Sequence, residues 1–303
     1  MKKIILITGA NGMLAKDLAN QLEEEYTIRF LTRKVSKDNE FLWDLKNNYI
    51  DPKALIGVHN IIHLAGSSVA EKRWTEKRKH DILSSRVASA QLILDTLKKN
   101  QLTINAFISA SAIGYYGTNN TDTIFNEESP KGIDFLSNVC DKWEQVAHAF
   151  QSKQIAKRIA IVRIGIILAK DGGALQKITK PISFGFGSGI GTGKQYMPWI
   201  HIQDLSGIFK YILSNEQVNG IFNAVSPEDI TNIEFTKKIA KFIKRRIILP
   251  NIPKFMIQVL FGEMGTILLN GNRISSKKIT DIGFKFNFKS LDDALKNLLL
   301  TKI

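Results

Sequence analysis

The segment TGANGMLA, residues 8–15, constrains the fold of this chain most strongly, because two glycines separate an apolar run from the start of a helical pattern. Gly9 permits a tight turn there, and Gly12 lets the backbone approach a pyrophosphate group closely. Ala15 is small enough for the following helix to pack on the preceding strand. The N-terminus of that helix offers free N–H groups and a partial positive charge to an anion. The segment therefore predicts a dinucleotide-binding turn after the first strand.

Apolar runs alternate with helical patterns along the first half of the chain. We expect strands at residues 3–7, 27–31, 60–64, 104–109 and 159–165, and helices at residues 12–24, 75–99 and 134–150. Strands rich in Ile and Val that are separated by helices indicate a parallel sheet covered on both faces. The fold class is therefore predicted to be α/β, a Rossmann-type doubly wound sheet.

Beyond residue 170 the pattern loosens. A glycine-rich loop at 185–194 precedes a short strand at 220–225, and short helical pieces follow residue 250. A last helix is expected at 290–300, where Ser290 and Asp293 fit a capping box. We predict a Rossmann body over residues 1–170 and a mixed region over 171–303, which completes the sheet and forms a smaller substrate lobe.

The bulk composition is that of a soluble globular protein, with 303 residues, 44% hydrophobic and 23% charged. The single cysteine, Cys140, excludes an internal disulfide and fits a reducing compartment, so we expect a cytoplasmic protein. Its first residues imitate a signal peptide, but Gly9 and Gly12 interrupt the apolar run too early. No stretch approaches the roughly 18 apolar residues of a membrane span. We expect neither a membrane partner nor a metal site.

The net charge of +14 raises the question of nucleic-acid binding. Lys is spread along the whole chain, and the one dense run, KFIKRR at residues 241–246, suits the solvated face of a helix. Because a phosphate-tracking groove needs clustered charge, we do not expect a nucleic-acid partner. The charge favours a small anionic substrate, and the sequence leaves the oligomeric state open.

The end of the second predicted strand distinguishes between cofactors. An Asp or Glu at this position binds the ribose 2′-OH of NAD, but this chain has Thr32 and Arg33. A guanidinium can grip a 2′-phosphate through two hydrogen bonds, and a hydroxyl can add another. The alternative is an ordinary exposed Arg at a strand end. After a dinucleotide turn, Arg33 predicts NADP(H) in preference to NAD(H).

Several blocks together resemble the extended short-chain dehydrogenase/reductase superfamily, in its NAD(P)-dependent epimerase/dehydratase group. The blocks are ILITGANGMLA, AGSSVAEKRWTEKRKHDILSSRV, ISASAIGYYG, FLSNVCDKWEQVA, VRIGIILAKDGGAL and QYMPWIHIQDL. They are most similar to the atypical branch often labelled "epimerase family" or "cell-division-inhibitor-like", and the likeness extends over essentially the whole chain. No residue supports the cell-division label.

The resemblance implies an NADP(H)-binding Rossmann fold and a small C-terminal domain at about residues 250–300. It also implies cofactor contacts from the glycine turn, the ends of the later strands and the helix at 134–150. Together with Thr32 and Arg33, these expected contacts are Gly9, Asn11, Gly12, Met13, Leu14, Leu64, Ala65, Gly66, Ser109, Ala110 and Cys140.

The chain departs from the superfamily at its catalytic pair. The typical helix reads Tyr-x-x-x-Lys-x-x-x-Glu, and matching its Glu to Glu144 puts Cys140 at the Lys position and Leu136 at the Tyr position. In ordinary members the Lys holds the nicotinamide ribose and lowers the pKa of the Tyr. An unassisted phenol costs about 4 kcal/mol to ionise at pH 7. The standard proton transfer is therefore absent as written.

Three residues are candidates for replacing that pair. Ser111 matches the superfamily's catalytic Ser/Thr, although a backbone group at the strand end can also satisfy its hydroxyl. Tyr115 is the best available proton donor, and the alternative is aromatic packing over the cofactor edge. Matching on Val87 puts Arg86 at a position facing the nicotinamide, where it can restore the missing positive charge. The alternative is a polar helix face.

Substrate is expected over the carboxyl ends of the strands, between body and lobe. The candidate contacts are Tyr116, Arg163, Trp199 and His201, with a structural ion pair as the alternative for Arg163. Cys140 has two interpretations, an inert packed thiol or a reactive one. The sequence thus predicts an NADP(H)-dependent oxidoreductase or epimerase acting on a small metabolite. The alternative is a regulatory protein that senses NADP(H) without turnover.

Overall fold

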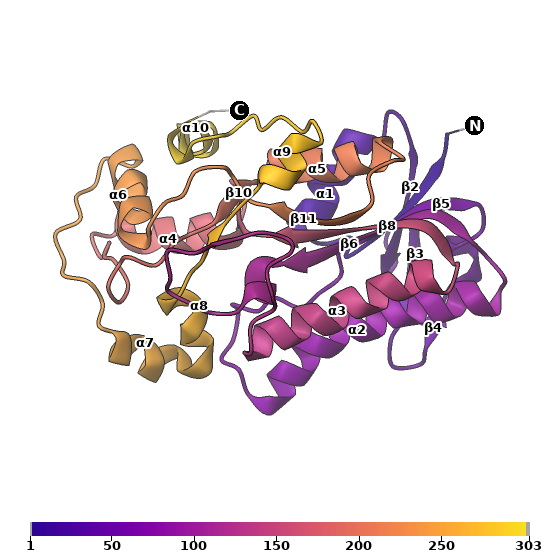
Figure 1. Ribbon diagram of the computed structural model, residues 1–303, viewed down its shortest axis with the longest axis horizontal. Helices are drawn as coiled ribbons and strands as arrows, with labels where there is room; N and C mark the ends of the chain where they lie inside the picture. The colour runs from indigo at the N-terminus through magenta and orange to yellow at the C-terminus, as the bar shows by residue number, and fades with distance from the viewer. Residues whose placement is uncertain (1, 301–303) are drawn as a thin grey trace.

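An eight-stranded sheet forms the middle layer of a computed structural model that describes residues 2–300 (Figure 1). Neighbouring strands pair in parallel throughout the sheet, except for the antiparallel pair β3 and β4. The predicted doubly wound α/β fold is confirmed. In spatial order the strands are β11 (Gly220–Ala224), β8 (Ala156–Ile164), β6 (Ile104–Ala112), β5 (Val58–His63), β1 (Ile4–Thr8), β2 (Thr27–Thr32), β3 (Glu40–Asp44) and β4 (Tyr49–Ile50).

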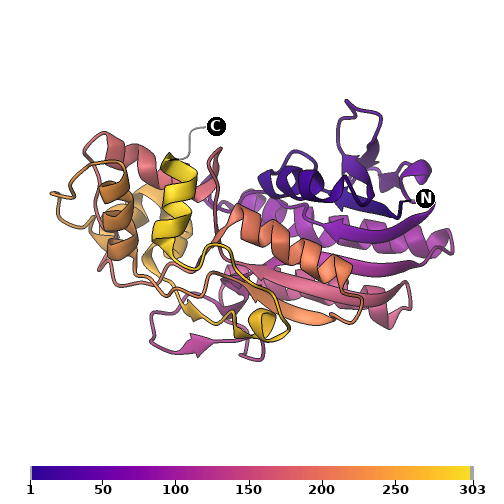
Figure 2. The same cartoon turned by 90° about the horizontal axis from the view of Figure 1, so that it is seen from above.

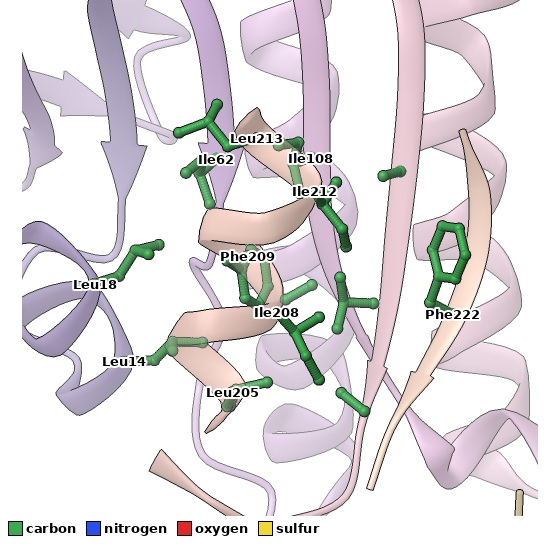
Figure 3. Packing of buried hydrophobic residues seen from close by; sticks show 14 of the residues in the cluster. Leu14, Leu18, Ile62, Ile108, Leu205, Ile208, Phe209, Ile212, Leu213 and Phe222 are labelled. Atoms are coloured by element: carbon green, nitrogen blue, oxygen red, sulfur yellow. The ribbon is translucent and has the colours of Figure 1, made fainter. Parts of the chain in front are cut away.

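Four helices cover the two faces of the sheet. Helices α1 (Met13–Leu22) and α5 (Ile202–Ser214) share one apolar cluster with the sheet, which Figure 3 shows from close by. Helices α2 (Glu76–Lys99) and α3 (Phe135–Ser152) share the other cluster. Adjacent residues of one strand point to opposite faces, because the side-chain period of a strand is two. Thus Ile62 packs against α1 and α5, whereas Ile61 packs in the cluster of α2 and α3.

A smaller lobe lies at one end of the sheet (Figure 2). Its buried residues come chiefly from α4 (Gly173–Ser183), α6 (Asn232–Phe242), α10 (Leu291–Leu295) and the π-helical turn η4 (Lys296–Leu300). The short helices α7 (Lys254–Phe261), η3 (Gly262–Gly265) and α8 (Thr266–Leu269) continue it. The remaining elements are β7 (Ile124–Phe125), which pairs with β12 (Arg273–Ile274), β9 (Ile166–Leu168), which pairs with β10 (Trp199–His201), and η1 (Pro52–Ala54), η2 (Ile113–Tyr116) and α9 (Lys277–Asp281).

Side-chain caps fix where the two central helices begin. Thr75 accepts a hydrogen bond from the Arg78 N–H and starts α2, and Asp134 accepts one from the Ser137 N–H and starts α3. Both helices lie within one or two residues of their expected bounds. The basic run at 241–246 was expected on the solvated face of a helix. Instead, α6 ends at Phe242, so most of this run lies in the segment that follows the helix. Among residues 2–300, no helix combines the length and apolar character needed to cross a membrane.

Candidate cofactor and substrate site

The turn between β1 and α1 is built for close backbone approach. Gly9 has a φ of +79°, and a Cβ there would lie 3.2 Å from the carbonyl oxygen of Leu64. The hydroxyl of Thr8 accepts hydrogen bonds from the Leu64 N–H at 2.9 Å and the Ala65 N–H at 3.0 Å. These bonds tie the ends of β1 and β5 together, and a side chain at Gly9 would separate them.

The start of α1 is open to an anion. Gly12 is its N-cap, so no side chain caps the helix, and its first turn contains no acidic residue. Asn11 and Gly12 are exposed and Met13 is half-buried, whereas Leu14 is a core residue that can contribute only its backbone N–H. The loop before α4 approaches here, because a Cβ at Gly172 would lie 3.2 Å from the Met13 sulfur. The residues present fit a pyrophosphate at this turn.

Arg33 directly follows β2. Arg33 is exposed, and among residues 2–300 no hydrogen bond or ion pair engages its side chain. Thr32 is different: it is buried, and its hydroxyl donates to the Lys34 carbonyl at 3.2 Å. The expected contact from Thr32 to the cofactor is therefore replaced by a turn contact. With Lys34 and Lys37, Arg33 makes the loop after β2 cationic.

Arg86 is on α2, and its guanidinium lies beside Gly66, in the segment that follows β5. Its guanidinium carbon is 5.2 Å from the centre of the Trp143 ring, and its Nη1 donates to the Ile82 carbonyl at 2.9 Å. A Cβ at Gly66 would lie only 3.0 Å from that guanidinium carbon, so Gly66 leaves the space that Arg86 fills. Arg86 is close enough to Cys140 for its charge to act on the thiol. The structure thus brings the expected cation next to the position of the missing Lys.

Cys140 and Leu136, which stand at the positions of the missing Lys and Tyr, face η2. A Cβ at Gly114 in η2 would lie 3.3 Å from the Leu136 Cβ and 3.8 Å from the Cys140 sulfur. Burial, and to a lesser degree Glu144, raises the pKa of the Cys140 thiol to about 12, although Arg86 opposes this. The thiol therefore stays protonated near neutral pH and is packed, which is the inert alternative. Its expected cofactor contact is not accessible in this structure.

A buried ion pair lies beneath the site. Arg163 on β8 donates from Nε to Glu144 Oε1 at 2.9 Å and from Nη2 to Oε2 at 2.8 Å. The Ser111 hydroxyl donates to Glu144 Oε1 at 2.6 Å. Ser111 is 2% exposed, so its expected role as a donor to substrate needs correction: its hydrogen is already given to a carboxylate. Arg163 therefore forms the structural ion pair that was the alternative to a substrate contact.

The two adjacent tyrosines have different environments. Tyr116 has no exposed surface, donates to the Asn223 side-chain oxygen at 2.7 Å and accepts from Arg163 Nη1 at 3.0 Å. Burial raises the pKa of Tyr116 to about 12 despite Arg163. Tyr115 is only half-buried, and its ring stacks 3.4 Å from the guanidinium carbon of Arg163. Tyr115 is therefore the phenol that can meet a ligand, while Tyr116 is a core residue.

Two further expected substrate contacts belong to the lobe. Trp199 is fully buried in the apolar cluster of the lobe. His201 is also buried, accepts the Gln203 N–H at 3.1 Å as the cap of α5 and stacks on Phe288. Pairing of β10 with β9 turns both side chains inward, away from the expected loop surface. Ser109 and Ala110 are likewise buried at the end of β6, under the expected cofactor path.

A small cavity of about 70 Å³ lies between the body and the lobe, next to Leu136. It is lined by Trp74, Thr118, Asp134, Phe135, Leu136, Glu263 and Thr266. The Lys79–Glu263 ion pair at 2.6 Å joins its two sides, and the rings of Trp74 and Phe135 meet at 5.1 Å. The sequence carried no signal for Glu263, because 184 positions separate it from its partner Lys79. Trp143, which Arg86 contacts, was also missed.

Comparison with known proteins agrees with this geometry. Residues 5–135 match the model of the NAD dependent epimerase/dehydratase family, and residues 252–298 match a domain of unknown function, DUF1731. The Arabidopsis thaliana "Epimerase family protein SDR39U1 homolog, chloroplastic" is 30% identical over 305 residues, covering 97% of this chain and 86% of the plant protein. An epimerase family protein of Staphylococcus haemolyticus is 31% identical over 307 residues, covering 98% and 99% of the two chains.

A solved structure extends the likeness to three dimensions. The crystal structure of human epimerase family protein SDR39U1, isoform 2, with NADPH has a TM-score of 0.89 and 29% identity to this chain. The match covers 99% of this chain and 100% of the human chain. The relation therefore includes both the sheet and the lobe.

Proposed function

We infer that this chain, which belongs to the NAD dependent epimerase/dehydratase family, binds NADPH and transfers hydride to or from a small metabolite. The observation that carries the proposal is the position of Arg86, a cation next to Cys140, where the superfamily's Lys is missing. Keeping a charged guanidinium half-buried costs free energy, and pairing with a bound cofactor would offset that cost.

The preference for NADPH rests on the loop after β2. Arg33 is free to pair with a 2′-phosphate, with Lys34 and Lys37 nearby, and no acidic residue stands where NAD binding needs one. The NADPH bound to the human relative supports the same choice. A compartment that keeps the single cysteine reduced, such as the cytoplasm, fits this reading.

The residues of the chain divide the chemistry among them. Bound nicotinamide would supply or accept the hydride. Arg86 would orient the ribose and favour negative charge nearby, and Tyr115 would give or take the proton at the reacting oxygen. Glu144 and Arg163 hold β8 and α3 rigid beneath Tyr115. The substrate would enter beside Leu136, between body and lobe.

A second function has one specific observation in its favour. Ser111 is buried and gives its hydrogen to Glu144, so the usual donor to a substrate oxygen is occupied. A regulatory protein that binds NADPH without turnover needs no such donor. For such a protein the cofactor site would be the same, but Tyr115 would transfer no proton.

Isotope transfer separates the two functions. Protein would be incubated with NADPH carrying deuterium on either face of C4 and with a metabolite extract, and products would be examined by mass spectrometry. An enzyme should move the label into a product, with transfer reduced about 10²–10⁴-fold by Tyr115→Phe while NADPH binding is kept. Arg86→Ala should weaken both binding and transfer, with Lys99→Ala at the exposed end of α2 as its control. Binding without label transfer would leave the regulatory reading.

A further inference from the structure

Helix α7 turns an apolar face outward. Six of its eight residues are apolar, yet only Ile257 is buried. The exposed fractions of Phe255, Met256, Val259 and Leu260 are 64%, 43%, 70% and 59%. These four positions share one side of a helix, because residues four apart lie on the same face. A soluble protein rarely exposes such a continuous apolar stripe without a partner.

A second group of apolar side chains stands at the same end of the lobe. Phe184 and Phe186 are each 69% exposed on either side of Gly185, and Ile248 is 78% exposed. The segment after α4 and the segment before α7 run side by side, since the Ile252 N–H donates to the Gly189 carbonyl at 2.8 Å. In Figures 1 and 2 the ends of α4 and α6 and the whole of α7 lie at this end of the molecule. We call Phe184, Phe186, Ile248 and the four exposed apolar residues of α7 the apolar tip.

The two segments that carry the apolar tip are rich in cations. Residues 172–203 contain three Lys and no Asp or Glu, and residues 235–262 contain seven Lys or Arg and no Asp or Glu. The cations flank the apolar residues directly. Lys180 precedes Phe184 by one helical turn, and the exposed side chains that adjoin Ile248 and Phe255 are Lys244, Arg245, Arg246 and Lys254.

This combination selects among the partners that could cover the tip. A second copy of the chain docked through the same face would bring two sets of like charges together, which opposes association. An anionic surface would instead attract the cations while the apolar side chains leave water. The apolar side chains of the tip are 43–78% exposed, so they are accessible for insertion between lipid headgroups.

We propose that the apolar tip binds the surface of a membrane rich in anionic phospholipids, with α7 and the Phe184–Phe186 loop lying in the headgroup region. From the sequence we expected no membrane partner, because the chain has no apolar stretch long enough to span a bilayer. Peripheral binding needs no spanning helix, so the lack of such a stretch does not bear on it. Hydrophobic insertion and cationic attraction act together in binding of this kind. The inference concerns a surface away from the cofactor turn and goes beyond the proposed function.

Vesicle sedimentation tests the proposal with the full chain. Vesicles of phosphatidylcholine alone are compared with vesicles that also contain phosphatidylglycerol. The protein should sediment with the anionic vesicles and be released by salt. The triple variant Lys244→Gln, Arg245→Gln, Arg246→Gln should weaken binding about a hundredfold, at about fivefold for each cation. The double variant Phe184→Ser, Phe186→Ser should reduce it at least about tenfold.

Matched variants control for unspecific effects. Ile56→Ser removes an exposed apolar side chain before β5, and Lys98→Gln with Lys99→Gln removes cations at the end of α2; neither should change binding. As a positive signal, the fluorescence of Phe186→Trp should shift to the blue only with anionic vesicles. Equal binding to both vesicle types, or binding that the tip variants leave unchanged, would overturn the proposal. So would dimer formation lost in those variants, or capture of an acidic polypeptide without vesicle binding.

Discussion

Glu144 receives Arg163 through both of its carboxylate oxygens, at 2.9 and 2.8 Å, in the interior beneath the candidate site. The pair links α3 to β8, and Ser111 adds a third element, β6, through its bond to Glu144. The helix at the position of the superfamily's Tyr-x-x-x-Lys pattern is thus tied to β8 by a buried ion pair. A group that transfers a proton to a ligand must therefore lie outside this buried pair, as Tyr115 does.

Removing the charge of Glu144 should destabilise the fold strongly. Glu144→Gln keeps the shape of the side chain but leaves the guanidinium of Arg163 buried without a counter-ion, so we expect a loss of about 3–5 kcal/mol in the free energy of unfolding. Urea unfolding measures it. Lys277→Gln, which breaks the exposed Lys277–Asp281 pair, is the control and should cost no more than about 0.5 kcal/mol. A loss below about 1 kcal/mol for Glu144→Gln would contradict the buried pair.

The neighbouring tyrosines should respond differently to loss of the hydroxyl. Tyr116→Phe leaves the oxygen of Asn223 and an N–H of Arg163 without a partner in the interior, which should cost about 1–3 kcal/mol. Tyr115→Phe should change stability by less than about 0.5 kcal/mol, because it is half-buried and no hydrogen bond engages its hydroxyl among residues 2–300. Thermal unfolding of both variants checks this. Equal effects would refute the division of roles between them.

His63 should make the fold sensitive to acid. It is fully buried, bonded to Ser89 at 2.8 Å, and burial together with the charge of Arg86 lowers its pKa from 6.5 to about 3. In the window between these values the unfolded chain binds a proton that the folded chain does not, so stability is complete above pH 6.5 and falls as the pH drops. By about pH 5 the loss should reach about 2 kcal/mol.

The measurement for His63 is urea unfolding between about pH 7 and pH 5. His63→Gln should flatten the pH dependence relative to the parent, whatever its effect at neutral pH. His148→Gln changes an exposed histidine and should leave the slope as it is. An unchanged slope for His63→Gln would show that His63 is not the group responsible.

Cys140 should react slowly with thiol reagents in the folded protein. Burial and Glu144 raise the pKa of its thiol to about 12, so the thiolate that reacts is scarce at pH 8. Modification by an aromatic disulfide reagent should be at least about a hundredfold slower than in urea, where the chain is unfolded. Rapid modification of the folded protein would revive the reactive interpretation of Cys140.

Local signals carried most of the fold. The glycine turn, the Ile- and Val-rich runs and the caps Thr75 and Asp134 each determine their element within a few residues. Strands β1, β2, β5, β6, β8 and β11 and helices α1, α2 and α3 were therefore predictable. Strands β3, β4, β7, β9, β10 and β12 were missed. They have two to five residues, too few for a clear periodic pattern, and in the pairs β7–β12 and β9–β10 the two partners lie far apart along the chain.

The site was predictable only where backbone conformation or a register match decided it. Gly9 and Gly12 indicate a tight turn without any partner residue, and alignment on Val87 placed Arg86 near Cys140. Their roles toward a cofactor stay predictions. The burial of Ser111, Tyr116, Arg163, Trp199 and His201 could not be seen, because it depends on Glu144, Asn223 and the lobe core meeting in space. Polar residues at strand ends look alike in sequence whether they face a ligand or an ion pair.

The proposed function depends on NADPH binding at the glycine turn and on its selection through Arg33. Fluorescence titration of the parent and of Arg33→Ala with NADPH and with NADH tests it most directly, with Lys37→Ala as a neighbouring control. We expect the parent to bind NADPH more tightly than NADH, and Arg33→Ala to lose about tenfold or more in affinity for NADPH alone, as expected for a charge-assisted contact. Binding of neither nucleotide, or equal loss of both in the variant, would contradict it.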